Sequence, residues 1–170
     1  MKIVFDTNVI LSAYVARGLA NTVFEHCLEE HEIVISAPIL AELESRLQEK
    51  LKIPKHNVAI MSDLLRIACQ VDAVSEVDPS ACRDRTDLHI LGLALHSKAD
   101  VIVSGDEDLL IIRSFNGIPI QTPRQFWESE RKKDPRLLGM KTPGTSHKVH
   151  DRSPRKYQSG RRNPADKSKR

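Results

Sequence analysis

Short apolar runs alternate with longer amphipathic segments of helical period along the first 127 residues. The apolar runs predict strands at residues 2–6, 33–36, 101–104 and 118–121. The segments between them predict helices at residues 8–14, 20–30, 38–51, 55–70, 86–97 and 107–113, and from Pro123 onward. Strands separated by helices are typical of a parallel sheet covered on both faces. We therefore expect an α/β fold, a Rossmann-like three-layer sandwich with a central parallel sheet.

The pattern fades beyond Trp127, where the composition also changes. Residues 131–170 contain 14 Lys or Arg and 3 Asp or Glu, which gives a net charge of +11. Residues 1–130 contain 12 Lys or Arg and 20 Asp or Glu, which gives a net charge of −8. Lys, Arg, Ser, Pro and Gly dominate the last thirty residues, a composition that buries too little apolar surface to fold. We predict a folded domain at residues 1–130 and a basic, disordered C-terminal tail at residues 131–170, whose charge suits either the capture of a polyanion or a solubilising or partner-docking role.

Four carboxylates fall at positions that the predicted fold brings together. Asp6 ends the first predicted strand and Asp106 follows the strand at 101–104, so both are expected at the carboxyl edge of the sheet, where α/β folds bind ligands. Glu42 and Asp87 lie on or beside helices that can pack against the same edge. Two such charges about 4 Å apart repel by about 4 kcal/mol at an effective dielectric constant near 20. A divalent cation would relieve that repulsion.

Each of these carboxylates also has a purely structural interpretation. Asp6 and Asp106 can cap the helices that follow them, and Asp87 lies in a helix-capping arrangement. Glu42 precedes Arg46 by four residues, the spacing of an ion pair on a helix surface. Taken one at a time, the structural interpretations are preferred. The coincidence of four acids at one predicted edge favours a shared site.

The residue types at this edge indicate which metal it would bind. Mg²⁺ and Mn²⁺ prefer carboxylate and water oxygens, and the four positions include neither Cys nor His. Asp6 and Asp106 are expected to bind the ion directly. Glu42 and Asp87 are expected to hold a second ion or to orient a water molecule, and Asp108 is a further candidate ligand.

Three polar residues are candidates for orienting these carboxylates. Asn8 and the hydroxyls of Thr7 and Ser104 can hydrogen-bond to them. A local role in turn chemistry accounts for Thr7 equally well. The seven histidines are dispersed and none has a catalytic setting, so His89, two residues after Asp87, is expected at a solvated helix position.

The remaining features concern the cellular compartment. The three cysteines are far apart and lack Cys-x-x-Cys spacing, so neither a disulfide framework nor a zinc site is predicted from them. No apolar run approaches the roughly 20 residues that a membrane span needs, and the chain enters a strand directly at its N-terminus. We expect a cytoplasmic protein without membrane association.

The order of four short motifs resembles that of the PIN (PilT N-terminus) domain. The motifs are Phe5-Asp6-Thr7-Asn8-Val9-Ile10-Leu11, Ile39-Leu40-Ala41-Glu42-Leu43, Asp84-Arg85-Thr86-Asp87 and Val103-Ser104-Gly105-Asp106-Glu107-Asp108-Leu109. The resemblance covers about residues 1–127 and is to the VapC-like toxins of toxin–antitoxin systems. It implies a parallel α/β sandwich, a metal-dependent nuclease and acidic site positions at Asp6, Glu42, Asp87 and Asp106. Arg85 and Thr86 depart from the Asp-Pro-Asp-Asp that is frequent in this branch, so an auxiliary acid is missing.

The resemblance and the acidic positions together predict a Mg²⁺- or Mn²⁺-dependent endoribonuclease that hydrolyses RNA phosphodiester bonds, the toxin of a toxin–antitoxin pair. The candidate partners are an RNA substrate, a cognate antitoxin protein and a second copy of the chain in a homodimer. One alternative is a noncatalytic RNA- or partner-binding module. Another is an aspartyl phosphohydrolase of the haloacid dehalogenase type, which is disfavoured because Asn8 stands where that chemistry normally uses a second Asp.

Overall fold

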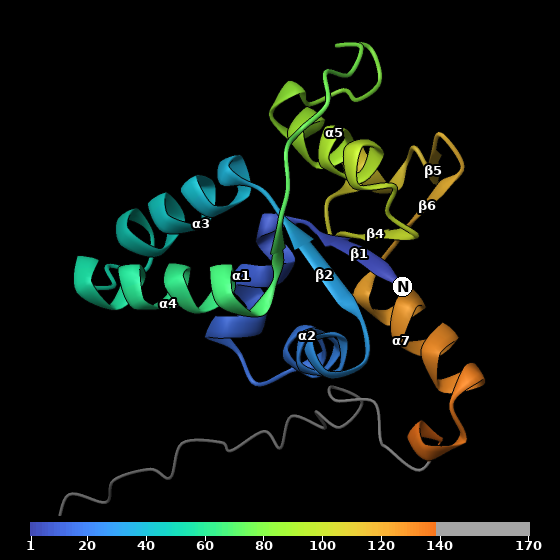
Figure 1. The fold of residues 1–170 in the computed structure, drawn as a ribbon, viewed down its shortest axis with the longest axis horizontal. Helices are drawn as coiled ribbons and strands as arrows, with labels where there is room; N and C mark the ends of the chain where they lie inside the picture. Colours follow the sequence, from blue (N-terminus) through green and yellow to red (C-terminus); the bar gives the residue numbers. More distant parts are fainter. Residues whose placement is uncertain (139–170) are drawn as a thin grey trace, which may run out of the picture.

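The computed structural model describes residues 1–138, which fold around one six-stranded sheet (Figure 1). The strand order is β3-β2-β1-β4-β6-β5. All neighbouring strands are parallel except β5 and β6, which are antiparallel. The strands are β1 (Lys2–Phe5), β2 (Glu32–Ile35), β3 (Gln70–Val71), β4 (Val101–Val103), β5 (Ser114–Phe115) and β6 (Ile118–Gln121).

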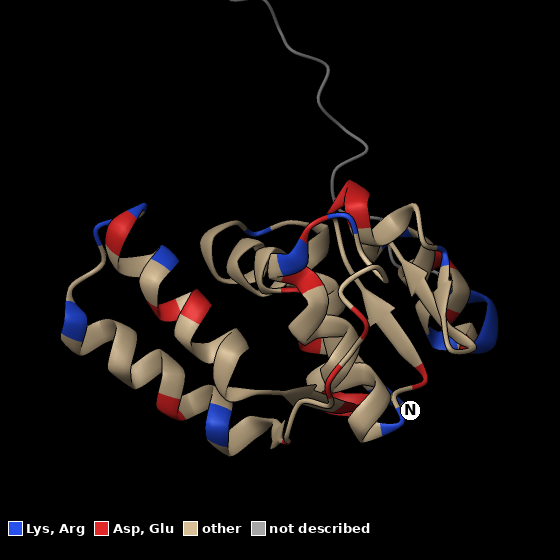
Figure 2. Cartoon of the chain, turned by 90° about the horizontal axis from the view of Figure 1, so that it is seen from above, with Lys and Arg blue, Asp and Glu red and all other residues tan. Residues whose placement is uncertain are grey.

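Helices cover both faces of this sheet. They are α1 (Thr7–Val15), α2 (Leu19–Glu30), α3 (Ala37–Glu49), α4 (Lys55–Ala68), α5 (Leu88–Ser97), α6 (Glu107–Leu110) and α7 (Pro123–Lys133), with 3₁₀ turns η1 (Arg85–Asp87) and η2 (Pro135–Leu137). Helix α5 packs on β1 and β2 from one side, and α2 and α7 lie on the other side (Figure 1). Helices α3 and α4 lie side by side. Acidic and basic residues are interspersed along these two helices (Figure 2). The predicted three-layer α/β sandwich is confirmed.

The central strands form the core because their side chains are apolar on both faces. Every residue of β4 is buried, as are the last three residues of β1 and of β2. Val4, in the middle of β1, lies opposite Val34 on one side and Ile102 on the other. Nearly continuous apolar strands of this kind are typical of parallel sheets covered by helices on both faces.

The sheet contains two short strands that the hydrophobic pattern did not predict. Strands β3 and β5 have two residues each, and β5 makes the sheet mixed rather than purely parallel. Asn116 and Gly117 connect β5 to β6 with φ angles of 47° and 83°. Positive φ at both positions is what a type I′ hairpin turn requires, and Asn-Gly is its preferred sequence.

The folded chain continues past the predicted domain boundary at residue 130. Helix α7 runs to Lys133, and the side chain of Asp134 caps η2 by accepting a hydrogen bond from the backbone N–H of Arg136. Leu137 is buried, and the Nε of Arg131 donates to its carbonyl oxygen at 3.2 Å. These contacts give residues 131–138 a defined place against the domain. The rest of the predicted tail, residues 139–170, lies outside the described residues.

The three cysteine side chains are free thiols and all are buried. Burial raises the pKa of the Cys69 thiol to about 11, which keeps it protonated and unreactive at neutral pH. Within residues 1–138, no helix combines the length and the apolar character needed to cross a lipid bilayer.

Candidate active site

Strands β1 and β4 bring the predicted acids Asp6 and Asp106 to neighbouring positions. The two strands are parallel neighbours with Phe5 opposite Val103, and the Asp6 N–H donates to the Val103 carbonyl at 3.0 Å. Each aspartate then caps a helix: Asp6 accepts from the Asn8 N–H at 3.1 Å, and Asp106 accepts from the Asp108 N–H at 2.8 Å. Capping and a shared position at the sheet edge are therefore compatible, because each cap uses only one carboxylate oxygen.

The hydroxyl of Ser104 links the two strand ends. It donates to Oδ2 of Asp6 at 2.8 Å and accepts from the backbone N–H of Asp106 at 2.9 Å. Ser104 is fully buried and Asp6 is 3% exposed. The Asp6 carboxylate is thus held in one orientation by a hydrogen bond to each of its oxygens.

Helix α3 places Glu42 beside the start of α1. Thr7 is buried and donates its hydroxyl to Oε2 of Glu42 at 2.6 Å, while Arg46 pairs with Oε1 of the same carboxylate. Arg46 also donates to the side-chain oxygen of Asn8. Asn8 hydrogen-bonds a carboxylate through its backbone N–H, which donates to Asp6, whereas its side-chain oxygen accepts from Arg46.

Asp87 lies at the end of η1, where it faces the other acids. Burial and then the charges of Asp106, Asp6, Asp84 and Glu42 raise its pKa to about 7. The pKa of Asp6 is also raised, chiefly by burial; the hydrogen bonds from Asn8 and Ser104 lower it, and the charges of Glu42 and Asp106 are smaller raising contributions. The structure therefore brings the four predicted acids close enough to repel one another.

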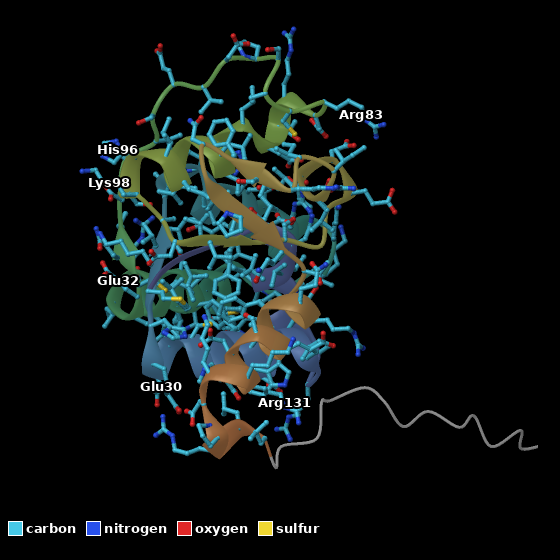
Figure 3. All side chains as sticks on the ribbon, turned by 90° about the vertical axis from the view of Figure 1, so that its right-hand side faces the viewer. Glu30, Glu32, Arg83, His96, Lys98 and Arg131 are labelled. Atoms are coloured by element: carbon cyan, nitrogen blue, oxygen red, sulfur yellow. The ribbon has the colours of Figure 1, made fainter. Side chains whose placement is uncertain are left out.

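Asp108 lies beside this group and is engaged elsewhere. Its carboxylate pairs with Nη2 of Arg83 at 2.6 Å, and the Arg83 side chain is exposed at the surface (Figure 3). The Asp108 charge contributes to the raised pKa of the Cys82 thiol, whereas the charges that raise the pKa of Asp87 come from other residues. Asp108 therefore contacts the site through its backbone N–H on Asp106 rather than through its side chain.

The structure adds Arg46 and His89 to the residues expected at this site. Nδ1 of His89 lies 2.6 Å from the Thr86 carbonyl oxygen, so this nitrogen is the donor. Its Nε2 is buried, has no hydrogen-bond partner among residues 1–138, and lies 3.6 Å from Oε2 of Glu42. The expectation of a solvated position for His89 is wrong because the first turn of α5 points this ring toward α3. In the sequence, the indication that His89 could lie at this site was its position two residues after Asp87.

The donor set of this site fits hard divalent cations. Asp6, Asp106, Glu42 and Asp87 offer carboxylate oxygens, the ligands that Mg²⁺ and Mn²⁺ prefer. Burial is the largest cause of the raised pKa values of Asp6 and Asp87, and the charges of the neighbouring carboxylates raise both further. A cation bound among these oxygens would relieve the repulsion between the carboxylates, so the residues fit a metal centre.

The raised pKa of Asp87 predicts a pH dependence of stability for the metal-free protein. The folded protein keeps this proton up to a pH of about 7, whereas the unfolded chain loses it near 3.8. Between these values the folded state binds more protons, so the free energy of unfolding falls as the pH rises. In EDTA, the melting temperature of the Asp87→Asn variant should therefore fall less over this window than that of the wild type. Parallel pH profiles for the two proteins would contradict the assignment.

Comparison with known proteins agrees with this arrangement. A sequence model described as the PIN domain matches residues 2–108, a range that includes all four acids. A chain from a crystal structure of VapBC2 from Rickettsia felis, bound to a DNA fragment from their promoter, superposes with a TM-score of 0.53 at 16% sequence identity. The match covers 72% of this chain and 98% of that one, and at this identity it shows a shared fold. Among curated proteins no relative is found. Because the matched range spans more than half of the sequence, the chain belongs to the PIN domain family.

Proposed function

We propose that this protein is a Mg²⁺- or Mn²⁺-dependent endoribonuclease in which Asp6, Glu42, Asp87 and Asp106 form the catalytic metal site. The observation that carries the proposal is the meeting of the four acids at the carboxyl ends of β1 and β4, where burial and then the charges of the other acids raise the pKa of Asp87 to about 7. A protein keeps such unbalanced charge at a functional site when a cation or substrate compensates for it. PIN-family membership supports nuclease chemistry for this site.

The four carboxylates would have different roles, because their environments differ. Asp6 and Asp106 cap α1 and α6 from adjacent strand ends, and they would bind one ion through the oxygen lone pairs that their hydrogen bonds leave free. Thr7 and Arg46 hold Glu42 in place, and Glu42 and Asp87 would bind a second ion or orient the attacking water. A bound cation would supply acidity to a coordinated water and stabilise charge on the phosphate. Asp87, with a pKa near neutrality, is the carboxylate suited to releasing its proton when the cation arrives.

We further propose that the protein is the toxin of a toxin–antitoxin pair, with an antitoxin as its partner. Support comes from the PIN-domain match and from the fold shared with the VapBC2 chain. RNA as the substrate, a homodimeric state and a cytoplasmic location belong to the same proposal.

The test of function is cleavage of labelled RNA by the purified full-length protein, with Mn²⁺ or with EDTA. We expect cleavage with Mn²⁺, none with EDTA, and recovery when Mn²⁺ is restored in excess. RNA that is bound but never cut would support the alternative of a noncatalytic binding module. Cleavage that persists in EDTA would contradict the metal-dependent mechanism.

A further inference from the structure

A second group of potential metal ligands joins helices α2 and α7. His26 lies in α2, His31 caps its C-terminal end, and Glu130 lies in α7. Nε2 of His31 is 2.7 Å from Oε2 of Glu130, and Nε2 of His26 is 3.8 Å from the same oxygen. One ligand atom from each of the three residues lies within 4.8 Å of the other two. The two helix ends are side by side near the labelled residues Glu30 and Arg131 (Figure 3).

This group lies near the amino ends of the strands, whereas the four acids lie at their carboxyl ends. His31 immediately precedes β2, and Lys133, which donates to Oε1 of Glu130 at 2.9 Å, approaches the sulfur of Met1 at 3.9 Å. The amino ends of β1 and β2 are therefore nearby, whereas Asp6 and Asp106 follow the carboxyl ends of their strands. The two groups can be occupied independently.

The two imidazole rings are fixed by aromatic packing. The rings of His26 and Trp127 pack edge-on, with centroids 5.5 Å apart and an angle of 82° between their planes. The rings of His26 and His31 also pack edge-on, with centroids 5.5 Å apart and an interplanar angle of 83°. His31 in turn packs edge-on against Phe126. Glu130 is 6% exposed, and Lys133 holds its Oε1, which leaves Oε2 directed at the histidines. Side chains that are already held close to their bound positions bind a metal with a smaller entropic cost.

Hydrogen bonding within the group leaves one polar atom unexplained. The contact between His31 and Glu130 satisfies those two side chains. Nε2 of His26 is buried and has no hydrogen-bond partner in the described part of the chain, although it points toward the same carboxylate. A buried nitrogen without a partner is unfavourable, and such atoms in native proteins often indicate an absent water or ion.

We propose that His26, His31 and Glu130 form a binding site for a first-row transition-metal ion of the Zn²⁺ type, which fastens α7 to α2. Two imidazoles and one carboxylate are a ligand set that Zn²⁺ accepts, whereas Mg²⁺ prefers oxygen ligands alone. Tetrahedral Zn²⁺ with bonds of about 2.0–2.1 Å separates its ligands by about 3.3 Å. The distances from Oε2 of Glu130, 2.7 and 3.8 Å, lie on either side of that value.

The site would retain an open fourth position. His26 and Trp127 line a surface pocket together with Asp134 and Arg136 from the segment after α7. A water molecule at the His26 side of this pocket would complete four-coordination with three protein ligands. Binding would link His31 and Glu130, which are 99 positions apart in the sequence, and so would stabilise the attachment of the last helix to the domain.

The proposal is tested by titrating the full-length protein with Zn²⁺ in millimolar Mg²⁺, which occupies the acidic site. We expect one tight Zn²⁺ site in the wild type and a loss of affinity of more than about 100-fold in His31→Gln and Glu130→Gln, since loss of an outer-shell partner alone costs 10–100-fold. His56→Gln, which removes an exposed histidine of α4, is the matched control and should bind like the wild type. His147 and His150 remain in every protein, so any Zn²⁺ they bind cancels in the comparison.

A second readout is the Zn²⁺-induced rise in melting temperature, which should occur in the wild type and His56→Gln and be absent in His31→Gln and Glu130→Gln. His26→Gln removes the nitrogen that has no hydrogen-bond partner, so it should disturb the metal-free fold least and still lose the site. Equal Zn²⁺ affinity in the wild type and His26→Gln would overturn the proposal. So would a wild-type protein that takes up no Zn²⁺ at micromolar concentrations, because the group is then only a hydrogen-bonded contact between helices.

Discussion

Replacing Asp6 by asparagine should reduce metal-dependent RNA cleavage by at least about 10²- to 10³-fold, the loss typical when one group that stabilises the transition state is removed. Asp6 is 3% exposed and lies between Ser104 and the Asn8 N–H. An amide keeps the volume of the carboxylate and can still accept from the Asn8 N–H while donating to Ser104. The substitution therefore removes a charged metal ligand and leaves the fold in place.

The matched control is Asp63→Asn, which removes an exposed carboxylate from α4. Both proteins should give the circular dichroism spectrum of the wild type, and only Asp63→Asn should cleave RNA at the wild-type rate. Full cleavage by Asp6→Asn, purified in the same way, would contradict the assignment and point to a contaminating nuclease.

Millimolar Mg²⁺ should raise the melting temperature of the wild-type protein by about 5–10 °C. A ligand that binds only the folded state at 100 times its Kd stabilises it by about 2.7 kcal/mol, and each kcal/mol corresponds to about 2–4 °C for a domain of this size. The physical source is relief of the repulsion among the carboxylates, which together with burial raises the pKa of Asp87 to about 7. Mg²⁺ suits this measurement because, as a hard ion, it discriminates against the imidazoles of His26 and His31.

Asp6→Asn should lose most of this increase, whereas Asp63→Asn should keep it. In the absence of metal, Asp6→Asn should melt at or above the wild-type temperature, because the substitution removes a buried charge that Glu42 and Asp106 repel. The same Mg²⁺-induced rise in all three proteins would locate the binding outside the acidic group.

The fold was predictable where the hydrophobic pattern is long and periodic. The four strands with three or four residues and the helices between them were predicted to within a few residues. Strands β3 and β5 were not, because two residues cannot establish a period of two. The Asn116-Gly117 pair was the usable signal for the hairpin that contains β5, since it favours the positive φ angles observed there.

The sheet topology predicts that the acids lie close together, but it does not predict which other side chains contact them. Asp6 and Asp106 meet because β1 and β4 are parallel neighbours, which an α/β pattern with acids at strand ends predicts. Arg46 and His89 join them only because α3 packs against both α1 and α5, and sequence spacing does not fix such packing. His26, His31 and Glu130 meet across almost the whole domain, so their sequence positions gave no indication of a group.

The central claim is that Asp6, Glu42, Asp87 and Asp106 hold a catalytic divalent cation. Its most direct test is anomalous diffraction from crystals grown with Mn²⁺, because the anomalous signal locates the ion without assuming its ligands. We predict a peak bound by carboxylate oxygens of Asp6 and Asp106, with Glu42 and Asp87 facing the same ion or a second one. A protein that cleaves RNA with Mn²⁺ but shows no peak between Asp6 and Asp106 would contradict the account.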